Sequence, residues 1–259
     1  MKIGVIYFFI IVFANTIGSI SGMGGGILIK PMMDAIGIHS LVEIAFYSCT
    51  AVLSMSIVST CRQLKNPINI NIKLALFLSF GALIGGISGQ YIFNQLLEFL
   101  PDDSAVQLIQ IIITVSTLVF ALIYTIKKWQ SLELANVIFY FLVGVFLGFL
   151  ASLLGIGGGS INVALLMFCF GIPIKEATVY SIITILFSQL SALITMGFTT
   201  GYDFFDLSLL LSIVPAAIIG GFLGAKLSGI LSEKIVLKLY QLIIIAVIVL
   251  NICNGIMLN

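Results

Sequence analysis

The stretches that decide the fold of this chain are Ser21-Gly22-Met23-Gly24-Gly25-Gly26 and Leu154-Gly155-Ile156-Gly157-Gly158-Gly159. Both lie inside long apolar stretches, and Gly24 and Gly157 are 133 residues apart (157 − 24) in a chain of 259. A glycine in a helix interior costs roughly 1 kcal/mol relative to alanine. Two triple glycines at matching positions of two halves therefore indicate broken helices, which in a membrane protein point to a transport site.

The composition is that of an integral membrane protein. Hydrophobic residues make up 61% of the chain and charged residues 8%, and the mean hydropathy is +1.26. Soluble domains carry roughly 25% charged residues. Several apolar stretches reach the length of about 20 residues that a membrane-spanning helix needs. The net charge of +1 gives no indication of nucleic-acid binding.

Residues that carry chemistry are few and scattered. The cysteines form no CxxC pair and are expected to be small buried hydrophobic residues, not a disulfide framework or a metal site. His39 lies in a predicted loop, where a solvated side chain is favoured over a proton relay. Without an H-E-x-x-H motif or paired carboxylates in mid-membrane, we predict no enzyme, no metal and no cofactor.

The N-terminus has features of a secretory signal peptide, with Lys2 before an apolar run over residues 3–14. We expect this segment to be retained. The apolar run continues past Ile17, and cleavage would remove part of the first glycine motif, whose counterpart lies inside the chain.

The predicted fold class is an all-α integral membrane protein with two four-segment repeats. The eight apolar segments span approximately residues 3–36, 41–61, 72–97, 105–126, 133–170, 175–197, 206–230 and 234–256. The first transmembrane repeat covers residues 1–127 and the second covers residues 132–259. The similarity extends beyond the glycines, because Glu-Ile-Ala-Phe-Tyr-Ser at 43–48 aligns with Glu-Ala-Thr-Val-Tyr-Ser at 176–181 at the same offset.

The loop charges predict that the two repeats are inverted. The loop at 62–73 carries three basic residues and is expected in the cytoplasm, whereas the equivalent loop at 202–206 carries two acids and no base. A unit of four full crossings cannot invert, but three crossings and one re-entrant segment can. We therefore expect the segments 3–36 and 133–170 to be helix, glycine break and short helix, with both termini outside. Two parallel halves whose short helices complete a span are the alternative.

A helix broken at mid-membrane can bind an anion without a buried lysine or arginine. The break frees backbone N–H groups, and the N-terminus of the following half-helix carries partial positive charge. Hydroxyl and amide side chains next to the breaks add hydrogen-bond donors. The predicted substrate-binding residues are Ser19, Ser21, Gly22, Gly24, Gly25, Gly26, Tyr47, Ser48, Ser152, Gly155, Gly157, Gly158, Gly159, Ser160, Asn162, Tyr180 and Ser181.

Close helix packing is the alternative explanation for these glycines. We favour packing for the later Gly-Gly-x-x-Gly stretches at 85–89 and 220–224, and a break with a site for the triple glycines. The pairs Tyr47-Ser48 and Tyr180-Ser181 fit two roles equally well, because their hydroxyls could face a central site or the tyrosines could be interfacial anchors.

Lys30 and Asp34 follow the first triple glycine by one and two helical turns. Lys30 has no counterpart in the second half, where Val163 occupies the matching position. We expect Lys30 to extend to the membrane surface. For Asp34, a pair with Lys30 or a solvated helix end is favoured over a transport role.

The chain resembles the TauE/SafE sulfite-exporter family, also called the TSUP family. The resemblance covers nearly the whole chain: the eight-segment pattern, the two G-x-G-G-G motifs and the Gly-Gly-x-x-Gly-Ala-Lys-Leu stretch at 220–227. It implies a multi-pass transporter of the bacterial inner membrane for sulfite, thiosulfate, sulfonates or related anions. The first-half copy of the late motif, Gly89-Gln90-Tyr91, departs from the pattern because it lacks the Ala-Lys pair.

The sequence thus predicts a secondary transporter that moves a small anion by alternating access. The alternatives are a structural membrane subunit, which would tolerate alanine at the triple glycines, and a transporter of an unrelated small solute. The expected partners are a small anionic substrate and the lipid bilayer, without nucleic acid. A homo-oligomer is compatible with the sequence, which does not fix the direction of transport or the coupling ion.

Overall fold

The computed structural model describes residues 2–65, 70–100, 102–127, 129–156 and 161–258. These residues form ten α-helices and two short 3-10 turns, Tyr202–Phe204 and Leu207–Leu209. The helices are α1 (Lys2–Ser21), α2 (Gly26–Ile36), α3 (Leu41–Gln63), α4 (Ile72–Phe99), α5 (Asp103–Lys127), α6 (Val137–Leu153), α7 (Asn162–Phe170), α8 (Ile174–Thr199), α9 (Leu210–Ile230) and α10 (Glu233–Met257). Seven are long and apolar enough to cross a membrane, and α6 is a shorter apolar helix.

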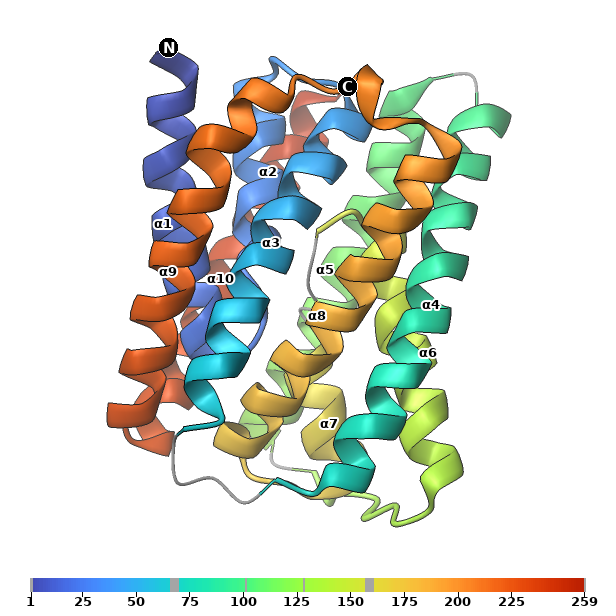
Figure 1. Cartoon of the computed structure of the whole chain (residues 1–259). Helices are drawn as coiled ribbons and strands as arrows, with labels where there is room; N and C mark the ends of the chain where they lie inside the picture. The colour runs from blue at the N-terminus through green and yellow to red at the C-terminus, as the bar shows by residue number, and fades with distance from the viewer. Residues whose placement is uncertain (1, 66–69, 101, 128, 157–160, 259) are drawn as a thin grey trace.

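The helices lie roughly parallel or antiparallel to one axis (Figure 1). α1 begins and α10 ends at the same end of the molecule, whereas α5 ends and α6 begins at the opposite end. α2 and α7 return towards the ends from which α1 and α6 start. Each half therefore has one re-entrant pair and three crossings, which confirms the predicted inverted arrangement.

The local sequence explains where several helices begin and end. A capping box starts α3, because the Ser40 hydroxyl accepts from the Glu43 N–H and the Glu43 carboxylate accepts from the Ser40 N–H. Both short helices end at a glycine in the left-handed region, Gly37 after α2 (φ 68°) and Gly171 after α7 (φ 66°). Glycine adopts this conformation at little cost, so the two re-entrant helices end in the same way.

The two halves of the chain are interleaved in space. α4, from the first half, packs most extensively along α6 and α8 of the second half, and α9 packs along α1 and α3. Small residues allow the close approach: a Cβ on Gly85 would collide with the Val145 carbonyl of α6, and one on Gly224 would collide with the Thr16 carbonyl of α1. The later glycine stretches therefore serve helix packing, as predicted.

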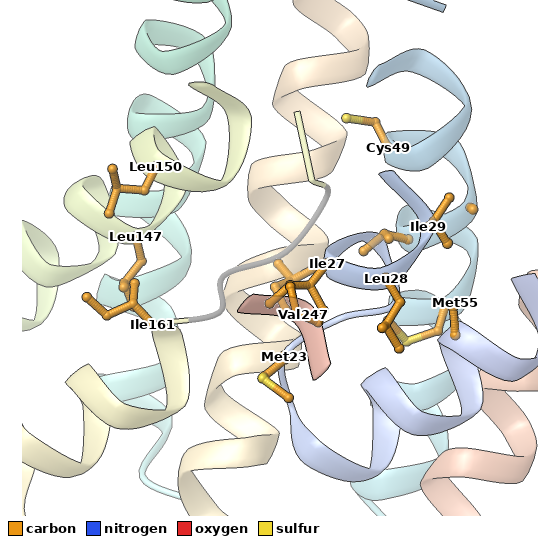
Figure 2. Packing of buried hydrophobic residues seen from close by; sticks show 14 of the residues in the cluster. Met23, Ile27, Leu28, Ile29, Cys49, Met55, Leu147, Leu150, Ile161 and Val247 are labelled. Carbon is orange, nitrogen blue, oxygen red and sulfur yellow. The ribbon is translucent and has the colours of Figure 1, made fainter. Parts of the chain in front are cut away.

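Apolar side chains form both the interior and the outer surface. One buried cluster joins α1, α2, α3, α6, α7 and α10, and Figure 2 shows part of it, including Met23 and Ile27 of the first broken segment and Ile161 of the second. On the outside, Phe9, Phe198 and Leu211 are among the largely exposed side chains. An apolar exterior of this kind suits a protein whose solvent is lipid.

Candidate functional site

The first predicted break lies between α1 and α2. α1 ends at Ser21 and α2 begins at Gly26. Gly22 and Gly24 both have φ of 77°, a left-handed conformation that glycine adopts without steric cost. The N–H of Gly24 turns back to the carbonyl of Gly18 at 3.3 Å. The glycines therefore make a tight reversal, and the predicted break is confirmed.

The second break lies at the equivalent position of the other half. α6 ends at Leu153, Gly155 has φ of 59°, and α7 begins at Asn162. Four residues of the predicted site, Gly157, Gly158, Gly159 and Ser160, lie outside the described part of the chain. The described flanks alone show that the chain leaves one helix and enters a shorter one here.

The two breaks meet inside the protein. A Cβ on Gly26, the first residue of α2, would collide with the carbonyl oxygen of Ile156 in the second break. The same Cβ would lie 2.8 Å from the hydroxyl of Ser48 in α3. Glycine at position 26 is therefore what lets the N-terminus of α2 touch the second break.

Each break also packs against the long helix that follows the other one. A Cβ on Gly22 would lie 2.7 Å from the Cα of Thr178 in α8, and one on Gly155 would lie 3.2 Å from the Cβ of Ala45 in α3. Gly155 and Thr178 follow Gly22 and Ala45 by the same offset of 133 residues. The two contacts are thus equivalent, and the inverted repeat is preserved at the level of single residues.

The described polar groups around the breaks are fully buried, and within the described part of the chain several lack a partner. Ser48, Ser152 and Asn162 each have 0% exposure, and their side-chain oxygen and nitrogen atoms have no hydrogen-bond partner among the described residues. Ser181 differs, because its hydroxyl donates to the carbonyl of Gly22 at 2.5 Å. Buried polar groups without partners are unusual and indicate a place where a polar ligand or water can bind.

Two other predicted serines are already engaged within the protein. The hydroxyls of Ser19 and Ser59 lie 2.7 Å apart. The Ser21 hydroxyl donates to the Ile17 carbonyl of its own helix at 2.9 Å. Both residues flank the first break, but their side chains are satisfied without a substrate.

The structure does not bring the hydroxyls of Tyr47 and Tyr180 to the breaks. The Tyr47 hydroxyl donates to the carbonyl of Asp206, just before α9, at 3.3 Å. The Tyr180 hydroxyl accepts from the N–H of Asn71, the residue before α4, at 2.6 Å. These bonds lie towards opposite ends of the molecule, and each joins one half of the chain to the other. Both tyrosines are buried, which does not suit an interfacial anchor.

Lys30 was predicted to extend to the surface, and that prediction is wrong. Lys30 is 4% exposed, and its ammonium lies 3.3 Å from the Asp34 carboxylate, which confirms the predicted pair. A Cβ on Gly155 would lie 3.6 Å from the Cε of Lys30. The lysine is thus covered in part by the second break, and α10 packs along α2, the helix that carries it.

Two buried amides that the sequence did not single out hold the broken helices. Gln110 of α5 donates from its side chain to the carbonyl of Leu153, the last residue of α6, at 2.9 Å. Asn254 of α10 donates to the carbonyl of Pro31 in α2 at 2.9 Å. The available signal was an isolated amide in an apolar helix, because such a group needs a partner away from water.

Two cavities lie towards opposite ends of the molecule. One of about 320 Å³ lies where α2 ends and α5 begins, and its wall includes Asp34, His39 and Asn254. The other, of about 490 Å³, lies where α7 ends and α8 begins, and its wall includes Asn71 and Tyr180. In the described part of the chain, no group of three or more His, Cys, Asp or Glu side chains is placed to hold a metal ion.

Comparison with known proteins gives the family of the chain. The family model for the sulfite exporter TauE/SafE matches residues 7–252. The chain belongs to the TauE/SafE family. A probable membrane transporter protein of Methanocaldococcus jannaschii is 28% identical over 230 residues, which cover 84% of each chain. A probable membrane transporter protein of Bacillus subtilis is 25% identical over 258 residues, which cover 90% of this chain and 92% of the relative. No solved structure matches.

Membership of the TauE/SafE family shows the general role of the protein, which is membrane transport. The match spans both glycine breaks and all ten helices, apart from the first and last few residues. The protein is a multi-pass membrane transporter, and the relative from Bacillus subtilis fits a location in a bacterial inner membrane.

Proposed function

We propose that this TauE/SafE protein is a secondary transporter that moves a small sulfur oxyanion or organosulfur anion, such as sulfite, thiosulfate or a sulfonate, by alternating access. The contact between the two breaks carries this proposal. Gly26 at the start of α2 abuts Ile156 of the second break, deep inside a helical membrane protein. Backbone that leaves the helix at membrane depth is tolerated where it lines a site or is buried in protein.

The electrostatics of the first break favour an anion. The N–H groups of Leu28 and Ile29 already bond to the Gly25 carbonyl, so the donors for an anion are those at the very start of α2. The helix dipole places about half a positive charge there. Ser48 beside Gly26 adds a buried hydroxyl without a partner among the described residues. A small oxyanion accepts hydrogen bonds on several oxygens, which matches a cluster of donors.

The inverted halves supply a way to open the site to each side in turn. Two cavities open at opposite ends of the molecule, one where α2 ends and one where α7 ends. The hydrogen bonds of Tyr47 and Tyr180 join the two halves near these ends. Exchange between two arrangements of such halves around a fixed site is the usual mechanism of inverted-repeat transporters. The sulfur chemistry of the anion is supported by the family's name alone.

Reconstituted vesicles test the proposal. Purified protein in liposomes is given sulfite, thiosulfate or ethanesulfonate, with a neutral solute of similar size and protein-free vesicles as controls. We expect at least one of these anions to cross the membrane only when the protein is present, and to raise its thermal midpoint in detergent. If no anion in the panel gives flux or stabilisation, the proposed substrate class is wrong.

A further inference from the structure

We propose that Lys30 is the cationic contact for the transported anion and that Asp34 holds its ammonium when no anion is bound. The inference rests on the proposed function and names the residue that gives the site its charge. Lys30 is 4% exposed and lies one helical turn beyond Gly26, where the two breaks meet. Three structural observations support the assignment.

The first observation is that the two halves carry different side chains at one pair of equivalent positions, 30 and 163. Lys30 lies against Gly155 of the second break, with its Cε 3.6 Å from the position of a Cβ there. Val163 is equivalent to Lys30 and lies against Gly22 of the first break, with its Cγ2 2.9 Å from the corresponding position. The repeat thus places a charged side chain on one side of the centre and an apolar one on the other.

The second observation is that the hydroxyl of Ser48, one of the unpaired hydroxyls beside the breaks, flanks the same junction as the lysine. Ser181 donates to the Gly22 carbonyl, whereas the equivalent Ser48 has no partner among the described residues. Ser48 lies beside Gly26 and one helical turn from Ala45, which is in contact with Gly155. Lys30, through its contact with Gly155, and Ser48, through its place beside Gly26, therefore both flank the junction of the two breaks.

The third observation is that the Lys30–Asp34 pair is poorly arranged for stability. Asp34 lies in the last turn of α2, where the helix dipole disfavours a negative charge. A lysine four residues before an acid is also the less favourable order on a helix. The two charges make one contact of 3.3 Å, and the other Asp34 oxygen has no partner among the described residues. This pairing leaves the ammonium able to take a second anionic partner.

Asp34 connects this ammonium to a route from outside the site. Its carboxylate side chain is 6% exposed and belongs to the wall of the cavity of about 320 Å³ at the end of α2. An anion that enters from this cavity meets the acid first and the lysine behind it. Asp34 is thus a positioning residue, which competes with the substrate for Lys30 and disfavours tight binding.

Anion affinity of four variants tests the assignment. Wild type, Lys30→Gln, Asp34→Asn and Lys30→Gln/Asp34→Asn are purified and titrated with thiosulfate, sulfite and ethanesulfonate at constant ionic strength, with thermal stabilisation and flux as readouts. We expect Lys30→Gln to weaken binding at least tenfold, equivalent to about 1.4 kcal/mol. We expect Asp34→Asn to tighten binding at least threefold, because the competing carboxylate is gone, and Asp34→Glu to stay near wild type.

The double variant and a surface control separate this role from a structural ion pair. If the pair only stabilises the fold, the neutral double variant binds anion as well as wild type. If Lys30 binds the anion, the double variant binds as weakly as Lys30→Gln. The double variant also decides between the two roles if Lys30→Gln alone does not fold. Lys73→Gln removes an exposed lysine and is expected to leave affinity unchanged.

The outcomes also distinguish this inference from the proposed function. Wild-type flux of a sulfur anion together with unchanged affinity in Lys30→Gln overturns the assignment of Lys30 alone. Equal weakening in Lys30→Gln and Asp34→Asn also overturns it. If neither wild type nor Asp34→Asn binds any anion of the panel, both proposals fail.

Discussion

At the scale of single residues, Gly26 is the position where a missing side chain creates the contact between the breaks. A Cβ there would collide with the backbone of Ile156, which cannot swing aside as a flexible side chain could. The N-terminus of α2 would have to move away from the second break. The contact between the breaks thus requires a residue without a Cβ at position 26.

We predict that Gly26→Ala abolishes most transport and lowers the stability of the protein by about 1–3 kcal/mol, the usual cost of overpacking. Gly255→Ala is the matched control, because a Cβ at this buried position of α10 would lie 3.8 Å from Ile111, an ordinary contact. It is expected to be neutral or to add up to about 1 kcal/mol of stability. Flux per protein and the thermal midpoint in detergent measure both effects. Normal flux in Gly26→Ala would show that the breaks can separate without loss.

The sequence predicted some of these residues well and others poorly, for identifiable reasons. Triple glycines disfavour a helix by themselves, so the position of the breaks follows from local chemistry. The burial of Lys30 depends on contacts with Gly155, which is far away in the chain. The two roles considered for Tyr47 and Tyr180 also missed the bonds that their hydroxyls make. Each tyrosine bonds to a residue in the half of the chain that does not contain it, Tyr47 to Asp206 and Tyr180 to Asn71.

At the scale of helices, paired hydrogen bonds join the halves at both ends. The Tyr180 hydroxyl accepts from the N–H of Asn71 at the start of α4. The Tyr47 hydroxyl donates to the carbonyl of Asp206 before α9. The two bonds occupy equivalent places, but only the first involves a backbone N–H. This difference allows one bond to be followed by amide exchange while the other serves as a control.

We predict that Tyr180→Phe speeds hydrogen exchange at the Asn71 amide about fivefold, since a hydrogen bond of this kind contributes about 1 kcal/mol. Tyr47→Phe should leave exchange at Asn71 unchanged, because its hydroxyl bonds to a carbonyl at the other end. Mass spectrometry with residue-level fragmentation measures this in detergent. Equal exchange in both variants would mean that the Tyr180 bond does not protect the start of α4.

The helix boundaries were predictable, whereas the partners of the helices were not. Apolar run length and capping residues set the ends of elements such as α3, where Ser40 and Glu43 form the capping box. The small-residue faces of α4 and α9 indicated close packing. Nothing local specified that α4 would lie along α6 and α9 along α1, because those choices depend on surfaces far apart in the chain.

At the scale of the whole molecule, the basic residues gather at one end, where Glu133, Glu176 and Glu233 also lie. This is the end where α3, α5 and α9 finish and where α4, α8 and α10 begin (Figure 1). The described basic residues in or next to these helix ends are Arg62, Lys65, Lys73, Lys127, Lys175, Lys226, Lys234 and Lys238. The acids Glu98, Asp102 and Asp103 between α4 and α5, and Asp203 and Asp206 before α9, lie at the other end. Basic loops remain in the cytoplasm, so the end with the basic residues is predicted to be cytoplasmic. The inverted arrangement and the charge pattern thus agree.

The two re-entrant segments are expected to enter the membrane from opposite sides. Ile38 lies just after α2 and is 53% exposed, while Ser131 lies beside Gly171 at the end of α7. Single cysteines at these two positions, in a background without the four native cysteines, can be labelled from each side with a reagent that does not cross membranes. We predict that Ile38→Cys reacts only from outside and Ser131→Cys only from the cytoplasm. Labelling of both from the same side would contradict it.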